Sequence, residues 1–97
     1  MNNLQEIITM IRSHLPNLQS KYKVKLLEVF GSYRRGEQKI GSDIDILVEF
    51  SETIDLIAFM QLEQELSDIL GNKVDLVMKD TLKPRIREQI LQEAMAV

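Results

Sequence analysis

The chain has 97 residues, a net charge of −3 and an ordinary composition, with 44% hydrophobic and 28% charged residues, which predicts one globular domain over residues 1–97. It has no cysteine and one histidine, so disulfides, thiolate metal sites and histidine-rich metal sites are excluded. The acidic balance disfavours direct nucleic-acid binding, and no signal peptide or membrane-length apolar run is visible, so we expect a cytoplasmic protein with no membrane contact.

The first part of the chain predicts a helix followed by a strand. Apolar residues at helical spacing predict a helix over residues 4–18, and Pro16 predicts that it stops near residue 14 or 15. The lysines at positions 21, 23 and 25 alternate with bulky residues, which predicts an exposed strand edge. They lead into a predicted strand over residues 26–30.

The rest of the chain alternates between helical and strand patterns. Gly31 ends the first strand, and Ser32 is predicted as the N-cap of a short helix that Gly36 ends. A central strand is predicted over residues 44–50. A helix is predicted over residues 54–70, with Ser51 or Thr53 as the residue that starts it and Gly71 as its stop. A strand over residues 73–77 and a last helix that starts between Thr81 and Pro84 follow. This order predicts an α/β fold, in which helices pack on a small sheet.

Asp43 and Asp45 form a pair of carboxylates at a spacing that suits metal binding. Carboxylates two positions apart on a strand point to the same face, so their oxygens can share one or two hard cations. Carboxylate oxygens favour magnesium, with manganese as the alternative. Two metal ions about 3.5–4 Å apart do much of the work in phosphoryl-type transfer, and they need bridging carboxylates at fixed spacing.

Asp75 is the candidate for a third carboxylate. It lies between Val74 and Leu76, in a segment otherwise built for burial, where an ionised carboxylate is costly unless it is paired or bound to a metal. A neighbouring strand would place Asp75 beside the face of Asp43 and Asp45. There it could complete a metal site and accept the proton of an attacking hydroxyl.

A phosphate cradle is predicted on the other side of the carboxylate pair. Gly31 lets the backbone approach a phosphate closely, and Ser32 offers a hydroxyl at a helix N-terminus. Arg34, with Arg35 beside it, can contact a leaving pyrophosphate, and Ser42 can donate to a phosphate or a carboxylate. Each feature is common on its own, but their order along the chain indicates nucleotidyl transfer.

Two stretches of the sequence resemble a known superfamily. Gly31-Ser32, ten further residues and Asp43-Ile44-Asp45 resemble the signature of the nucleotidyltransferases related to DNA polymerase beta. More narrowly, VFGSYRRGEQKIGSDIDILVEF, NKVDLVMKD and LKPRIREQILQEAM are similar to the minimal nucleotidyltransferases, called MNT domains. The resemblance covers residues 26–94 and retains every residue of the metal motif.

The resemblance implies a mixed β-sheet flanked by helices, with ATP as substrate and magnesium held by Asp43, Asp45 and Asp75. It also implies that Gly31 and Ser32 take the triphosphate. Proteins of this family resemble antitoxins encoded beside a HEPN-domain ribonuclease toxin. They transfer AMP onto a tyrosine hydroxyl of the toxin, which silences it. The resemblance therefore implies a HEPN toxin as partner, in a hetero-oligomer with this chain.

Two alternatives stay open at this point. The chain could be a catalytically silent antitoxin that neutralises its partner by binding alone, with exposed apolar residues of the first or last helix as the interface. Nucleotidylation of an antibiotic or another small metabolite is the second alternative, although it needs a longer chain to build the acceptor pocket. The small size and acidic charge favour a protein acceptor.

Overall fold

The structure is a computed structural model, and it describes residues 3–31, 33, 36, 42–81 and 84–97. In these ranges four strands form one mixed sheet in the order β3-β2-β1-β4. The elements in chain order are α1 (Leu4–Tyr22), β1 (Val24–Phe30), β2 (Ile44–Phe50), α3 (Leu56–Leu70), β3 (Val74–Met78), the 3₁₀ turn η1 (Lys79–Thr81), α4 (Pro84–Glu93) and β4 (Met95–Ala96). This arrangement confirms the predicted fold class.

The second strand, β2, is central, as the sequence predicted. It pairs antiparallel with β1 and parallel with β3. Its residues Ile46, Leu47 and Val48 are at most 1% exposed, so β2 is covered on both faces. A central strand of this kind is held by neighbours on both sides, which makes it a rigid base for any side chain at its start.

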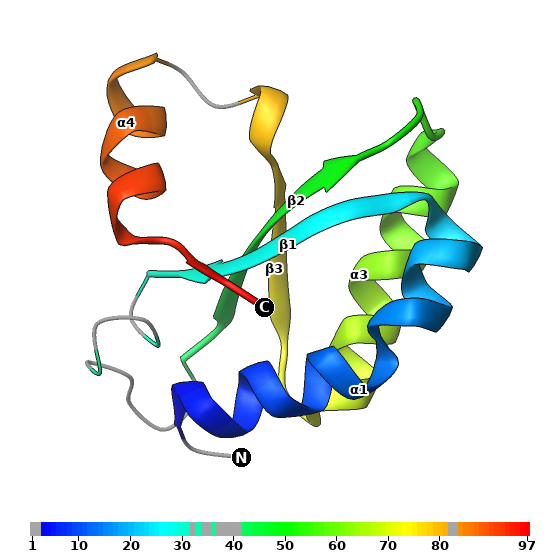
Figure 1. The fold of residues 1–97 in the computed structure, drawn as a ribbon, viewed down its shortest axis with the longest axis horizontal. Helices are drawn as coiled ribbons and strands as arrows, with labels where there is room; N and C mark the ends of the chain where they lie inside the picture. The colour runs from blue at the N-terminus through cyan, green and yellow to red at the C-terminus, as the bar shows by residue number, and fades with distance from the viewer. Residues whose placement is uncertain (1–2, 32, 34–35, 37–41, 82–83) are drawn as a thin grey trace.

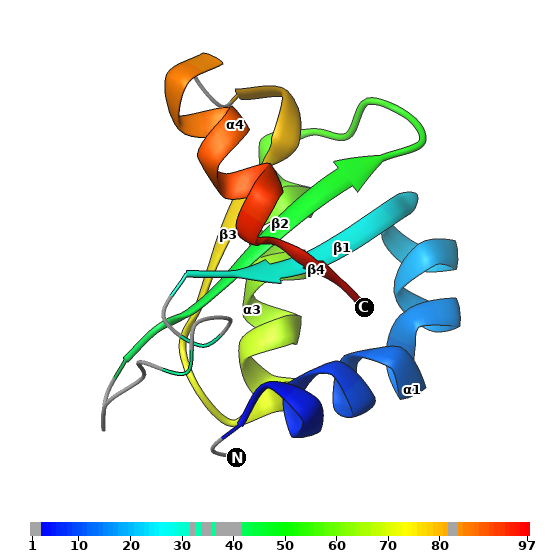
Figure 2. The ribbon, with the colours of Figure 1, turned by 60° about the vertical axis from the view of Figure 1, so that its left-hand side comes forward.

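The main core lies between the sheet and the pair of helices α1 and α3, which cover one face of the sheet (Figure 1). Helix α4 lies on the opposite side of the sheet in both views (Figures 1 and 2). The largest fully buried side chains come from all the layers that meet in this core: Ile7, Ile11 and Leu18 of α1, Leu62 and Leu66 of α3, and Leu27, Val29, Ile44 and Ile46 of the sheet. None of the helices that the structure describes is long and apolar enough to cross a membrane.

The first helix is longer than predicted, because it continues through Pro16 to Tyr22. Proline removes one helical hydrogen bond, but that loss is outweighed when the following turn buries apolar side chains. Leu18 is fully buried and Tyr22 is 5% exposed, so the second half of α1 is anchored in the core. The helix ends at Lys23, which adopts the left-handed conformation at φ 60°. The predicted stop near residue 14 or 15 is wrong.

The predicted lysine-rich strand edge is also wrong. Lys21 belongs to α1 and Lys23 caps it, so only Lys25 lies in β1. The strand β1 is not at the edge of the described sheet, because the two-residue strand β4 pairs with it through Glu28 and Val29. A strand as short as Met95–Ala96 carries no readable alternation, so the sequence did not predict it.

The long helix α3 begins later than predicted. Its N-cap is Asp55, whose carboxylate accepts a hydrogen bond of 2.7 Å from the amide of Ala58, in place of Ser51 or Thr53. Its predicted stop is confirmed, because Gly71 ends it in the left-handed conformation at φ 64°. The first position of α4 is Pro84, as the sequence predicted.

Candidate active site

The strand register brings the predicted acidic residues to one end of the sheet. Asp45 in β2 is opposite Phe30 in the antiparallel pair and opposite Asp75 in the parallel pair. Gly31 directly follows Phe30, and Asp43 directly precedes β2. The end of β1, the start of β2 and the start of β3 therefore carry the candidate site between them.

Asp45 and Asp75 lie on the same face of the sheet. Their neighbours Ile44, Ile46, Val74 and Leu76 belong to the core under α1 and α3. Because side chains alternate along a strand, Asp45 and Asp75 point to the other face. Asp45 is half-buried and Asp75 is exposed. The expectation that Asp75 is buried and needs a partner for that reason is therefore wrong, while its place beside the Asp45 strand is as predicted.

Gly31 lies directly against the carboxyl group of Asp45. It is buried and has a positive φ of 76°, a conformation that other residues rarely adopt. A Cβ atom placed on Gly31 would collide with Oδ2 of Asp45. The absence of a side chain at this position therefore brings the backbone after β1 next to the carboxylate of β2.

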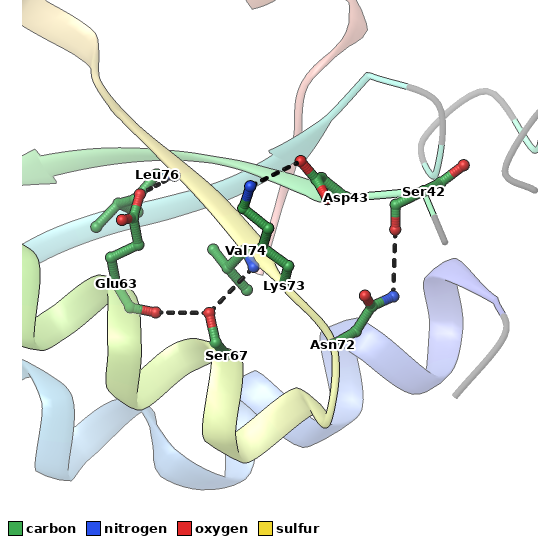
Figure 3. A network of polar contacts seen from close by, with 8 residues as sticks. All are labelled: Ser42, Asp43, Glu63, Ser67, Asn72, Lys73, Val74 and Leu76. Atoms are coloured by element: carbon green, nitrogen blue, oxygen red, sulfur yellow. Dashed lines mark hydrogen bonds and ion pairs between the residues drawn. The ribbon is translucent and has the colours of Figure 1, made fainter. Parts of the chain in front are cut away.

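Asn72 is a residue of the site region that the sequence analysis missed. It follows the C-cap of α3, and its side-chain amide donates to Oη of Tyr33 at 2.9 Å. The same amide donates to the carbonyl oxygen of Ser42 at 3.3 Å (Figure 3). Tyr33 is 4% exposed. Asn72 thus ties the segment after β1 and the segment before β2 to the turn that enters β3. In the sequence this position carries no signal beyond following Gly71, the predicted helix stop.

Lys73 places a positive charge beside the carboxylate pair. Its Nζ atom lies 3.8 Å from Oδ2 of Asp43 (Figure 3). The two side chains are 78% and 43% exposed, so this ion pair is weak and can exchange for other partners. The carboxylate of Asp43 is therefore accessible to a ligand.

Hard cations are the metal ions that suit this donor set. Asp43, Asp45 and Asp75 offer carboxylate oxygens only, which magnesium and manganese prefer. Within the ranges described, no three His, Cys, Asp or Glu side chains already lie in a group that could hold a metal ion. A bound ion would therefore have to draw these carboxylates together. Among the other predicted site residues, Ser32 and Arg34, as well as Arg35, lie outside the described residues, and Ser42 is half-buried.

The comparison with protein families identifies the class. The nucleotidyltransferase domain family matches residues 11–97. The chain therefore belongs to the nucleotidyltransferase family, the class that the sheet and the carboxylate arrangement fit.

Several relatives match the full length of the chain. A protein from Methanocaldococcus jannaschii is 50% identical over 98 residues, which cover 100% of both chains. The protein adenylyltransferase MntA from Thermococcus cleftensis is 44% identical over 97 residues, which cover 100% of this chain and 98% of the relative.

Solved structures with the same fold include a minimal nucleotidyltransferase and toxin–antitoxin assemblies. A minimal nucleotidyltransferase superposes with a TM-score of 0.81 at 37% identity, covering 95% of this chain and 94% of the other. A toxin–antitoxin structure with AMP-PNP matches with a TM-score of 0.69 at 34% identity, over 95% and 69% of the two chains. The complex of a tri-AMPylated HEPN toxin with its MNT antitoxin from Shewanella oneidensis matches with a TM-score of 0.60 at 30% identity, over 95% and 66%.

Proposed function

We propose that this chain transfers AMP from ATP to a hydroxyl, most simply that of a tyrosine, on a HEPN-domain toxin, and thereby acts as its antitoxin. The observation that carries the proposal is the register of the three strands. It sets Asp45 beside Asp75 and puts Gly31 against Asp45, so two carboxylates and the glycine of the Gly-Ser motif meet at one end of the sheet.

The proposed reaction forms one bond and breaks another. The acceptor oxygen attacks the α-phosphorus of ATP, and the bond from that phosphorus to the pyrophosphate oxygen breaks. The proton of the hydroxyl moves to a carboxylate, for which we propose Asp75 because it is exposed beside Asp45. Pyrophosphate leaves, and AMP stays on the toxin as a phosphodiester.

We propose the identity of the metal from the chemistry of the three carboxylates that would bind it. Asp43, Asp45 and Asp75 would hold magnesium or manganese, which neutralises charge on the triphosphate when bound. The accessible carboxylate of Asp43 and the half-buried one of Asp45 supply hard oxygen donors. Gly31 lets the backbone approach the phosphates, and Ser32, Arg34 and Ser42 are proposed on sequence grounds to contact them.

The relatives and solved structures support ATP and the toxin as substrates. A relative that matches the whole chain is a protein adenylyltransferase. Structural neighbours at 30–34% identity are toxin–antitoxin assemblies, one with AMP-PNP and one with an AMPylated HEPN toxin. We propose that this chain likewise forms a hetero-oligomer with a HEPN toxin.

Mass spectrometry tests the proposal directly. The purified chain is incubated with magnesium, ATP and the HEPN protein encoded beside it, and the intact mass and the peptides of the HEPN protein are measured. We expect the addition of one or more AMP groups on a hydroxyl-bearing side chain, with release of pyrophosphate. An unchanged partner mass under conditions where the two proteins form a complex would refute the transferase activity.

Neutralisation by binding alone is the second candidate function, and one feature favours it. Three apolar side chains at the start of α3 are strongly exposed: Leu56 at 71%, Ile57 at 69% and Met60 at 58%. Exposed apolar groups that cluster in this way are typical of protein–protein contacts. They lie on α3, whereas the sequence analysis expected the interface with the partner on the first or last helix. If the Asp43→Asn, Asp45→Asn double variant still protects cells from the toxin, binding alone is sufficient.

A further inference from the structure

The outer edge of β3 exposes backbone amides that need hydrogen-bond acceptors. In the described sheet β3 pairs with β2 alone, because it ends the strand order. The carbonyl oxygen of Lys73 accepts a hydrogen bond of 2.9 Å from the amide of Ile44 in β2. Successive residues of a strand direct their backbone groups to opposite edges, so the amides of Val74 and Leu76 point away from β2.

Helix α3 provides an acceptor for each of these two amides. Oγ of Ser67 accepts from the amide of Val74 at 3.0 Å, and Oε2 of Glu63 accepts from the amide of Leu76 at 2.9 Å (Figure 3). The Ser67 hydroxyl donates in turn to the carbonyl oxygen of Glu63 at 2.9 Å. Residues four apart lie on the same face of a helix, so one face of α3 contacts the edge of β3 at two points. We call Glu63 and Ser67 the outer clamp.

The outer clamp brackets a single residue, Asp75, which lies between Val74 and Leu76. On the inner edge of β3, Asp75 is in register with Asp45. We propose that Glu63 and Ser67 are positioning residues that hold the backbone of Asp75 at the spacing from Asp45 that the metal and the triphosphate require. This inference rests on the proposed function.

The core packing of β3 distinguishes the positioning role of the outer clamp from simple stabilisation of the strand. The side chains of Val74 and Leu76 are 2% and 5% exposed and pack in the core. That packing keeps β3 folded when the hydrogen bonds of the outer clamp are removed. What the clamp adds is a restraint on the backbone at Asp75, and catalytic geometry is sensitive to displacements of about 1 Å, which can cost about 100-fold in rate.

Two substitutions of Glu63 test the clamp. Glu63→Met removes the acceptor for the Leu76 amide at similar length, whereas Glu63→Gln keeps a carbonyl acceptor and removes only the charge. We expect Glu63→Met to lower the affinity for Mn²⁺ about 10- to 100-fold in the presence of AMP-PNP, as loss of outer-shell support does at other metal sites. Electron paramagnetic resonance measures free Mn²⁺. Glu63→Gln should stay within about threefold of the wild type.

A control variant and amide hydrogen exchange exclude an effect of lost stability. Ile8→Val removes a methyl group from the core on α1, far from the outer clamp in sequence. It should lower the unfolding temperature about as much as Glu63→Met does and leave the affinity for Mn²⁺ unchanged. Amide hydrogen exchange should become faster at Leu76 in Glu63→Met but not in Ile8→Val. If Glu63→Met does not fold, Ser67→Ala replaces it, with Ser67→Thr as the variant that restores the acceptor.

The outcomes distinguish this inference from the proposed function. Faster exchange at Leu76 with unchanged Mn²⁺ affinity would reduce the clamp to a stabilising contact and overturn the inference. Equal losses in Glu63→Gln and Glu63→Met would assign the effect to charge, which also overturns it. A wild-type chain that binds neither Mn²⁺ nor AMP-PNP, and leaves the toxin unmodified, would instead refute the proposed function, and the inference with it.

Discussion

Gly31 and Asp45 are packed against each other without room for a single additional carbon atom. A Cβ atom on Gly31 would lie 2.9 Å from Cγ and 3.1 Å from Cβ of Asp45, besides colliding with Oδ2. This contact joins the end of β1 to the second carboxylate of the Asp-x-Asp pair. It makes the glycine of the Gly-Ser motif a steric requirement of the fold as well as a feature of the proposed phosphate cradle.

Replacement of Gly31 by alanine should therefore damage both the site and the stability. The positive φ of 76° should cost about 1–2 kcal/mol for a residue with a Cβ, and the displaced Asp45 carboxylate should add to the loss of activity. We expect AMP transfer by Gly31→Ala to fall at least about 100-fold, the scale of losing one group that stabilises transition-state charge. Initial rates of AMP incorporation and thermal unfolding measure the two effects.

Gly71→Ala is the matched control for that substitution. Gly71 has a similar positive φ of 64°, but a Cβ there would meet no atom within 4 Å. Like Gly31→Ala, Gly71→Ala should lose about 1–2 kcal/mol of unfolding free energy because of its positive φ. Unlike Gly31→Ala, it should keep the wild-type rate of AMP transfer. If Gly71→Ala and Gly31→Ala lose activity equally, the effect comes from stability and not from the contact with Asp45.

The carboxylates of the site should be dispensable for folding. Asp75→Asn changes an exposed side chain, so it should alter the free energy of unfolding by no more than about 0.5 kcal/mol. The same substitution should lower AMP transfer at least about 100-fold if Asp75 is both ligand and proton acceptor. Thermal unfolding and the kcat for AMP incorporation test this pair of outcomes. Full activity of Asp75→Asn would remove it from the site.

Removal of the metal should stop transfer without unfolding the chain. The core of the described fold lies on the α1 and α3 side of the sheet, away from Asp45 and Asp75, so its packing does not depend on an ion at these carboxylates. We expect EDTA to abolish AMP incorporation, and added Mg²⁺ or Mn²⁺ to restore it. The circular dichroism spectrum should stay unchanged throughout. Transfer that persists after exhaustive chelation would contradict the proposed metal requirement.

The hydrogen bond between Asn72 and Tyr33 should contribute to the stability of the fold. Tyr33→Phe removes only the hydroxyl that accepts from Asn72, and a hydrogen bond of this kind contributes about 0.5–1.5 kcal/mol. Because Asn72 also holds the carbonyl oxygen of Ser42, Asn72→Ala should be more damaging than Tyr33→Phe. A double-mutant cycle of unfolding free energies should give a non-zero coupling, and additive effects would show that the bond contributes nothing.

The ion pair between α1 and α3 predicts a specific dependence on pH. The pKa of Lys21 is raised above its ordinary value of 10.5, because Glu65 accepts a hydrogen bond from it and attracts its charge. A raised pKa in the folded state stabilises the fold fully below pH 10.5, and this contribution is lost as the pH rises through the folded pKa. The gap in unfolding temperature between wild type and Lys21→Met should therefore be constant near neutral pH and shrink above pH 10.5. The gap is small, because Lys21 is exposed.

The elements predicted well from the sequence are those with strong local signals. The strand β2 follows from the apolar run of residues 46–48, and the end of α3 follows from Gly71, because both signals act through a few adjacent residues. The stop at Pro16 failed for the opposite reason. The cost of proline is local, but the burial of Leu18 and Tyr22 that outweighs it depends on the sheet and on α3. The strand β4 needs β1 as a template and carries no local signal.

The sequence already contains the groups from which we propose hard cations and phosphates as ligands, namely the Asp-x-Asp carboxylates and the Gly-Ser motif, and it has no cysteine. It also determined the family, because the spacing from Gly31 to Asp45 is a property of the chain. The tertiary structure alone decided which residues meet. The parallel pairing of β2 with β3 sets Asp75 beside Asp45, and the turn after α3 makes Asn72 and the outer clamp part of the site region. Such contacts join residues far apart in the chain, so they depend on strand register and helix packing, which no local pattern encodes.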